Sequence, residues 1–470
     1  MVIRAVCFVM VFLLLFGLTT EILKDKRIEG EYNPTTKVRG FYAEEKNTLD
    51  FVFIGSSQVY ADISPAVLYR DFGMTSYDFC ANEQPMWISY YYIKEALKRQ
   101  NPKAIILDVF TMYGADYEAE GVNHINLDDL PISLNKIGAI RDSVPKELRS
   151  SFYFEIAKYH TTWEGLDEAK FNATFQWEKD PMKGYSPFVN EADYETGARA
   201  EVVNQTEYEE LPERAKEWLL KIIELTKKEN VPLVLIKTPN GNAERQKLYN
   251  SVAKLAEEES IPFVNMNTVF DGEAHINVMQ AEKVTQYIGQ YLSDNYEFKD
   301  KRGQEGYEDW EKSVALFEAC KEQCSLISKT TLSEYLEELS TLDHKIILVA
   351  ANQTEHIPQK ALKAFKEFGV EWATADEAEK KYVAILSGKT VIKEHQGTGK
   401  QNISENIGGH SFRVKMNEDG EGKEKITFKV DGVDYAVPGE GVYIFVYDTV
   451  LEKAVDVVGT DPANMEVIVR

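Results

Sequence analysis

The sequence has 470 residues, of which 44% are hydrophobic and 11% aromatic, so it has room for two or three globular domains and little extensive disorder. Its 77 acidic and 53 basic residues give a formal net charge of −24. Such a charge repels the phosphates of nucleic acids and therefore argues against nucleic-acid binding.

The first predicted element is an apolar segment at the N-terminus. Sixteen uncharged residues lie between Arg4 and Glu21, and apolar neighbours on both sides extend the run. This length predicts a membrane anchor or a signal segment over residues 1–23. Because no small-x-small cleavage site follows, we favour an uncleaved anchor. Basic residues flank both ends, so their count does not fix the orientation. Residues 24–48 follow as a predicted linker.

From Leu49 onward, apolar runs alternate with helical patterns, which is typical of a parallel sheet with crossover helices. The sequence predicts an α/β fold over residues 49–295, a three-layer α/β/α sandwich with a five-stranded parallel sheet. The predicted strands lie at 49–57, 74–80, 102–110, 231–239 and 261–267, and the predicted helices at 63–73, 89–100, 212–229, 243–259 and 279–293.

Residues 112–205 interrupt this alternation. They are polar and rich in aromatic residues, and they contain no clear strand pattern, so we interpret them as a long insertion in the α/β domain. Tyr159, His160 and Trp163 lie in the insertion, where aromatic side chains either contact a sugar or have no role in binding.

A second domain is predicted after a charged linker at 296–312 that lacks apolar periodicity. Residues 313–470 combine two helix-and-strand pairs with a run of strands that have no helices between them, so the sequence predicts a smaller α+β domain. The predicted helices are 332–340 and 360–370, and the predicted strands are 345–351, 381–388, 412–416, 425–432, 441–448 and 454–461.

Four cysteines occur, and their spacing matches neither a zinc site nor a dense disulfide framework. Cys320 and Cys324 are four residues apart in a predicted helix and share one of its faces. They are therefore either two small buried side chains or a local disulfide. We expect no metal and no cofactor.

Two segments at opposite ends of the α/β domain carry residues suited to nucleophilic catalysis. FIGSSQVY (53–60) ends the first strand, and FDGEAHIN (270–277) precedes the last helix. In a parallel sheet both positions lie on the same rim. A serine hydroxyl needs a base to remove its proton, and a carboxylate orients the histidine that acts as that base. His275 is the candidate base and Asp271, rather than Glu273, the candidate orienting acid.

The same segments carry a resemblance. FIGSSQVY, the later SYDFC and EQP (76–85), YHTTWEGL (159–166) and HINVMQAEKVTQYIGQYL (275–292) occur in order. Together they resemble the SGNH/GDSL hydrolase-like proteins of bacterial envelopes, in particular the group related to the D-alanyl-lipoteichoic acid protein of Gram-positive bacteria. The resemblance covers residues 1–295 and implies an SGNH/flavodoxin-like fold, an N-terminal anchor and an extracytoplasmic position.

The resemblance also implies roles for individual residues. The Gly-x-Ser pattern puts the nucleophile at Ser57, with Ser56 in the variable position. The loop after the second strand would supply oxyanion and substrate contacts, for which Asn82 and Gln84 are the candidates. The sequence departs from the pattern at three points: Gln58 stands where a histidine is common, Cys80 stands where a glycine is expected, and Asp271 lies four residues before His275.

The C-terminal domain resembles the interleukin-like EMT inducer domain. The resemblance rests on KIILVAANQTEHIPQKALKAFKEFGV (345–370), YVAILSGKTVIKE (382–394) and GVYIFVYDTVLEKAVDVVGTD (441–461). In those proteins the Gly-Val strand pair precedes the helix-strand unit, whereas here it comes last, as in a circular permutation. The resemblance implies carbohydrate binding.

The sequence therefore predicts a membrane-anchored extracytoplasmic serine esterase or O-acyltransferase that acts on acyl groups of cell-envelope glycans through Ser57, His275 and Asp271. The alternative is a catalytically inactive SGNH scaffold that binds glycans or assembles an envelope-modification complex. The expected partners are the glycan, the membrane and a membrane-bound O-acyltransferase.

Overall fold

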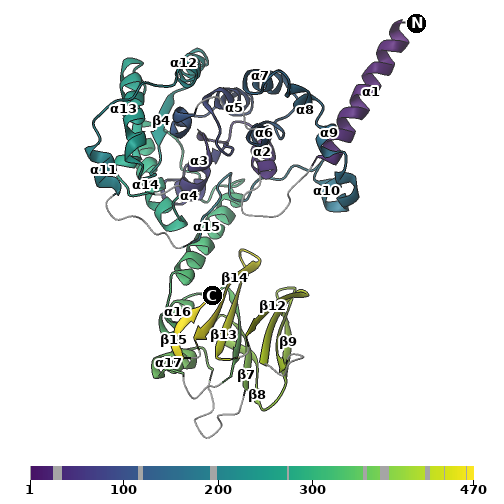
Figure 1. Cartoon of the computed structure of the whole chain (residues 1–470), viewed down its shortest axis with the longest axis vertical. Helices are drawn as coiled ribbons and strands as arrows, with labels where there is room; N and C mark the ends of the chain where they lie inside the picture. Colours follow the sequence, from purple (N-terminus) through teal and green to yellow (C-terminus); the bar gives the residue numbers. More distant parts are fainter. Residues whose placement is uncertain are drawn as a thin grey trace. The chain divides into compact units, whose positions relative to one another are not determined.

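Figure 1 shows the protein as a computed structural model, which describes residues 2–24, 34–114, 120–190, 198–272, 275–352, 357–370, 381–418, 424–438, 440–461 and 463–470. The chain divides into two compact units, which we call unit 1 and unit 2. Unit 1 comprises Met1–Phe188 and Ala192–Phe317, and unit 2 comprises Val189–Glu191 and Glu318–Arg470.

A five-stranded parallel sheet forms the centre of unit 1, as the sequence predicts. Its strands run in the order β2-β1-β3-β4-β5. Every residue of the first four in sequence is buried, as expected for a parallel sheet covered on both faces. The strands are β1 (Phe51–Ile54), β2 (Ser76–Asp78), β3 (Ala104–Asp108), β4 (Leu233–Lys237) and β5 (Phe263–Asn265).

The predicted crossover helices are present, and they pack on the sheet. Val52 and Ile54 of β1 share a core with Trp87 and Leu219, whereas the Phe51 ring lies 5.7 Å from that of Tyr296. The strand order has its topological switch between β1 and β3, and open α/β sheets bind ligands outside the carboxyl ends of such strands. The predicted helices are α4 (Pro65–Phe72), α5 (Met86–Arg99), α12 (Glu213–Lys228), α13 (Ala243–Glu258) and α14 (Val278–Asn295), and a further short helix that the sequence did not predict, α3 (Ser57–Asp62), precedes α4.

In the described part of the chain, two helices precede the sheet. Helix α1 (Val2–Leu23) has a mean hydropathy of 2.5 over its most apolar window, and within the described residues it is the one helix long and apolar enough to cross a membrane. Helix α2 (Pro34–Ala43) falls in the segment 24–48, which the sequence predicts to be a linker. Phe41 stacks on Phe79 with ring centroids 4.1 Å apart, so α2 is part of the core.

The insertion at 112–205 contains short helices joined by irregular segments, of which 173–190 is the longest, and no strand occurs in its described residues. This agrees with the lack of a strand pattern in the sequence. The segment contains η1 (Phe110–Tyr113, which begins just before it), α6 (Glu120–Leu127), α7 (Leu134–Ser143), α8 (Arg149–Tyr153), α9 (Ile156–Tyr159), η2 (Thr162–Gly165), α10 (Glu168–Asn172) and α11 (Ala198–Asn204).

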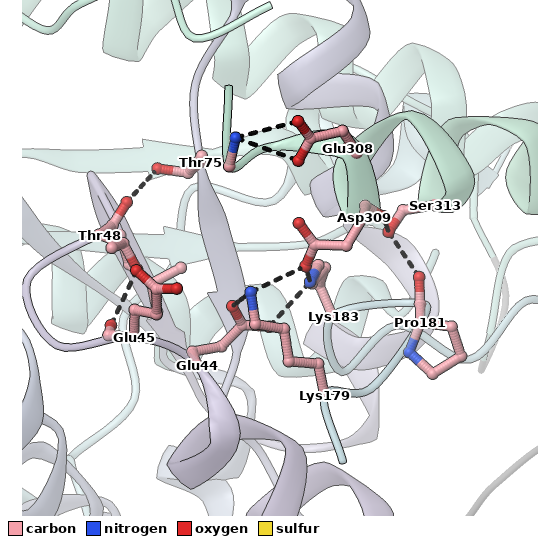
Figure 2. A network of polar contacts seen from close by, with 12 residues as sticks. Glu44, Glu45, Thr48, Thr75, Lys179, Pro181, Lys183, Glu308, Asp309 and Ser313 are labelled. Atoms are coloured by element: carbon pink, nitrogen blue, oxygen red, sulfur yellow. Dashed lines mark hydrogen bonds and ion pairs between the residues drawn. The ribbon is translucent and has the colours of Figure 1, made fainter. Parts of the chain in front are cut away.

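A polar network joins the start of α15 (Glu308–Ile327) to the rest of unit 1 (Figure 2). The ammonium group of Lys183 is fully buried; it lies 2.8 Å from Glu44 Oε1 and also donates to Asp309. Trp310 is buried in the core of unit 1. The segment 296–312, predicted to be a linker, therefore ends in a packed helix, because its charged residues have partners that the sequence does not reveal.

Unit 2 has the predicted α+β composition and contains two antiparallel sheets. The orders are β15-β14-β13-β6-β7-β8 and β12-β11-β10-β9. Its helices are α16 (Leu332–Leu339) and α17 (Gln359–Glu367), and its strands are β6 (Lys345–Ala351), β7 (Lys381–Ser387), β8 (Thr390–Gly397), β9 (Gln401–Ile407), β10 (His410–Glu418), β11 (Glu424–Val430), β12 (Val433–Pro438), β13 (Val442–Asp448), β14 (Lys453–Asp461) and β15 (Asn464–Val469).

Alternate residues of β6 enter two different cores. Leu348 packs with residues of the four-stranded sheet such as Phe412, while Ile347 packs with Leu336 of α16 and Phe365 of α17. This is the period of two expected for a strand covered on both faces.

Cys320 and Cys324 are both buried and form no disulfide, so the first of the two alternatives for this pair is correct.

Candidate active site

The serine pair lies at the end of β1, beside the switch in strand order. Ser56 caps α3 by accepting a hydrogen bond from the Gln58 backbone N–H at 3.3 Å. A Cβ on Gly55 would lie 2.8 Å from Asp108 Cβ, so only glycine allows the ends of β1 and β3 to approach this closely. Ser57 follows the cap as the first residue of α3, and it is 6% exposed.

The second segment reaches the same rim from the other end of the domain. His275 lies just before α14, and its ring stacks on Phe188 with centroids 5.0 Å apart. Its Nδ1 atom lies 3.5 Å from Nε2 of Gln58, which is 217 residues away in sequence. A Cβ on Gly272 would lie 2.6 Å from the carbonyl carbon of Pro239, so the loop before His275 presses on the loop after β4.

The orientation of the Gln58 amide follows from its other neighbours. Its Oε1 accepts from Lys237 Nζ and from the Thr238 hydroxyl, both at 3.3 Å. A lysine can only donate, so Oε1 faces Lys237 and Nε2 donates to His275 Nδ1. Burial lowers the pKa of His275, which favours the neutral ring. The proton of that neutral ring then resides on Nε2.

Lys237 is at the centre of a buried charged cluster that also contains Asp62 and Asp108. Burial lowers the pKa of Lys237 to about 8, although the two carboxylates oppose the shift. Burial raises the pKa of Asp108 to about 6 and that of Asp62 well above its usual value. In the part of the chain that is described, one oxygen of each carboxylate, Asp62 Oδ2 and Asp108 Oδ1, has no hydrogen-bond partner. The cluster can therefore hold or release a proton.

Sequence reasoning missed this cluster, although two of its members carry a signal. Asp108 and Lys237 are the last residues of the buried strands β3 and β4. A charged residue at the carboxyl end of an otherwise apolar strand is in the position where ligands bind in such sheets.

The predicted acid and base have different hydrogen-bond partners in the structure. Asp271 Oδ1 accepts a hydrogen bond from the Arg199 backbone N–H at 3.1 Å. Within the described ranges, no hydrogen bond joins His275 to Asp271 or to Ser57. Glu273 lies outside the described residues.

The predicted oxyanion residues are engaged within the fold. Gln84 is fully buried, and its Nε2 donates to the Ser89 hydroxyl at 3.1 Å. The Asn82 carbonyl accepts from Asn126 Nδ2 at 2.9 Å. The Cys80 thiol lies 3.5 Å from the Phe53 carbonyl oxygen, and burial raises its pKa. None of these contacts points a side-chain donor toward Ser57.

No group of three or more His, Cys, Asp or Glu side chains that could hold a metal ion occurs among the residues described. Comparisons of the chain with known protein families, with curated proteins and with solved structures gave no match.

Proposed function

We propose that the protein is a membrane-anchored serine esterase or O-acyltransferase, with Ser57 as nucleophile and His275 as base. The observation that carries the proposal is the contact between Gln58 and His275, which brings a histidine next to the serine loop at the switch in strand order. We further propose that unit 1 is an SGNH-type three-layer sandwich, in which α14, packed on α3 and α4, covers the face opposite α5.

The proposed chemistry is an acyl transfer in two steps. Ser57 Oγ attacks the carbonyl carbon of an O-acyl group while His275 takes the hydroxyl proton, and the Ser57 backbone N–H donates to the developing oxyanion. The proton then passes to the departing sugar oxygen, which leaves an acyl-enzyme. Water or another sugar hydroxyl attacks that ester in the second step, so hydrolysis and transfer share one intermediate.

The ring of His275 has to change its hydrogen bond for this step. A base must offer an unprotonated nitrogen to Ser57, but the proton of the neutral ring resides on Nε2 while Gln58 donates to Nδ1. The reaction therefore requires the His275 ring to leave the Gln58 amide, so that either Nδ1 itself or, after exchange of the tautomer, Nε2 accepts the proton of Ser57.

The same contact favours a second candidate function, a catalytically inactive scaffold that binds glycans or assembles an envelope-modification complex. In an active triad a carboxylate accepts from Nδ1, whereas here an amide donates to it. Asp271 and Gln84, the residues expected to complete the site, have other partners.

The setting of the proposed activity is the outer side of a membrane. Helix α1 serves as a single uncleaved anchor with the bulk of the chain extracytoplasmic, which suits acyl groups of cell-envelope glycans as substrates. Unit 2, an interleukin-like EMT inducer-like module, binds carbohydrate, and a membrane-bound O-acyltransferase supplies or receives the acyl group.

The deciding experiment uses the full-length protein in phospholipid nanodiscs. We expect hydrolysis of p-nitrophenyl acetate and labelling by a fluorophosphonate, both lost in Ser57→Ala and in His275→Ala. Ser56→Ala is the matched control, since it removes the neighbouring hydroxyl and retains Ser57. Equal hydrolysis by all four proteins, with unchanged melting temperatures and retained glycan binding, would establish the scaffold function instead.

A further inference from the structure

The C-terminal end of α1 is fixed inside unit 1. Thr20 and Lys24 are buried. Lys24 Nζ donates to the Asp128 carbonyl and lies 3.1 Å from Glu155 Oε2, and the Thr162 hydroxyl donates to the Leu23 carbonyl. The membrane helix therefore enters the folded domain without a flexible spacer.

The domain also flanks α1 well before the helix ends. An apolar groove of about 290 Å³ lies between α1 and the helices α7 and α8. Its walls include Leu13 and Phe16 of α1 and Ile137, Ile140 and Phe152 of the insertion. About half of the helix, from Leu13 onward, thus runs beside the domain.

The length of α1 determines what this means in a membrane. Its 22 residues span ~33 Å at ~1.5 Å per residue, close to the ~30 Å of a hydrocarbon core. The part that precedes the groove, Val2–Phe12, spans only ~16 Å. The hydrocarbon core can be crossed only if the groove and the surface beside it enter the bilayer as well.

That surface has the composition that immersion requires. Ile132, Leu134 and Phe154 are 75%, 86% and 58% exposed, and they lie in or beside α7 and α8. The Phe154 ring lies 6.4 Å from that of Phe16, and Ile132 lines the groove, so these two exposed side chains continue the apolar surface of α1. Exposed apolar patches of this kind mark contacts with membranes or proteins.

Charged groups appear where α1 ends. Lys136 Nζ lies 2.7 Å from Glu155 Oε1 and donates to the Asp128 carbonyl at 2.8 Å. Lys136 and Glu155 also line the groove, and together with Lys24 these groups form a buried polar layer beside it. The change from apolar to charged contacts along α1 matches the boundary between acyl chains and headgroups.

We propose that the surface formed by α1, α7 and α8 is immersed in the leaflet on the side of unit 1 and that the groove holds an acyl chain of a membrane phospholipid. The continuity of this surface with the membrane helix selects lipid as its occupant. Immersion holds unit 1 at a fixed height on the bilayer, and it does not depend on catalysis by Ser57.

The test uses the full chain in nanodiscs of phosphatidylcholine and phosphatidylglycerol. An environment-sensitive fluorophore is attached at Leu134→Cys, or at Ile132→Cys, in a Cys7→Ala background in which the remaining native cysteines are buried. Tyr208→Cys is the matched control, because Tyr208 is 67% exposed but stands between Glu207 and Glu209.

We expect a blue-shifted emission at positions 134 and 132 and at least ~3-fold stronger quenching by lipids with brominated acyl chains than at position 208. Equal quenching at the three positions would overturn the proposal. Shielding from aqueous iodide without quenching by the lipids would also overturn it, since protein would then cover the surface. For the groove, native mass spectrometry should detect bound phospholipid that Gly17→Trp, which fills the groove, displaces.

Discussion

Two of the lysines that unit 1 buries have different surroundings, and the contrast separates a structural site from a candidate functional one. Lys183 has the carboxylates of Glu44 and Asp309 in direct contact, and both lie within the polar network of Figure 2. A buried charge with direct partners of this kind is a structural feature, because removing it leaves the partner charges buried and uncompensated.

Lys237 is equally buried, but its surroundings are incompletely paired. Of the neighbouring carboxylates, Asp62 and Asp108 each retain an oxygen without a partner among the described residues, and the direct acceptors of Lys237 are the neutral oxygens of Gln58 and Thr238. Groups whose pKa values are moved toward neutrality in this way are concentrated at functional sites. The two lysines should therefore respond differently to substitution.

The largest effect is expected at the structural lysine. Lys183→Met removes the partner of two carboxylates, so we expect the free energy of unfolding to fall by about 3–5 kcal/mol. Denaturant unfolding of the purified chain measures this change. Adding Glu44→Gln should recover part of the loss, because it removes one of the charges left unpaired. A loss below ~1 kcal/mol would mean that the network of Figure 2 contributes little.

Gln58→Glu addresses the functional cluster. A carboxylate at this position would accept from His275 Nδ1, move the ring proton there and free Nε2 to receive the proton of Ser57. We expect kcat/KM for p-nitrophenyl acetate to rise by ~100-fold, since general-base catalysis contributes at least that factor. Gln58→Met, similar in size and unable to accept, is the control. An unchanged rate in a stable Gln58→Glu protein would count against His275 as the base.

The titration of Lys237 gives a smaller effect that depends on pH. Its pKa is about 8 in the folded protein and 10.5 in the unfolded chain. Between these values the unfolded chain binds a proton that the folded protein lacks, so stability should rise with pH. The rise is about 1.4 kcal/mol per pH unit at most. Lys237→Met should lack this rise when the free energy of unfolding is measured by urea titration between about pH 8 and pH 10.5. If the free energy of unfolding rose equally with pH in the Lys237→Met variant and in the unsubstituted protein, the lowered pKa of Lys237 would be contradicted.

The fold could be predicted from the sequence where the strands are completely buried. The strands β1 to β4 are runs in which every residue is buried, so both their positions and their parallel arrangement follow from the pattern. The strands β8, β9, β12 and β15 were missed. Three of them, β8, β12 and β15, are largely exposed or only partly buried. In β9 burial does alternate, but the polar residues Gln401 and Glu405 occupy two of the less exposed positions, so the sequence shows no apolar alternation.

The candidate site was predictable only in part. Ser57 and His275 could be proposed because serine and histidine carry recognisable chemistry. The role of Gln58 depends on Lys237, which lies 179 residues further along the chain, and no local pattern reports such a contact. The same reason explains why α2 and the start of α15 were predicted to be linkers. Their buried aromatic residues contact partners that lie far away in the sequence.

The smallest effect is expected at the acid that the sequence favoured. Asp271 bonds the Arg199 backbone through a surface contact, and His275 has its hydrogen bond with Gln58. Asp271→Ala should therefore change kcat/KM for p-nitrophenyl acetate by less than ~2-fold, whereas loss of a true triad acid costs ~10⁴-fold. Assaying Asp271→Ala beside Gln58→Met separates the two arrangements. A loss of ~100-fold or more in Asp271→Ala with an unchanged melting temperature would mean that the 270–277 loop rearranges during catalysis to bring this carboxylate onto His275.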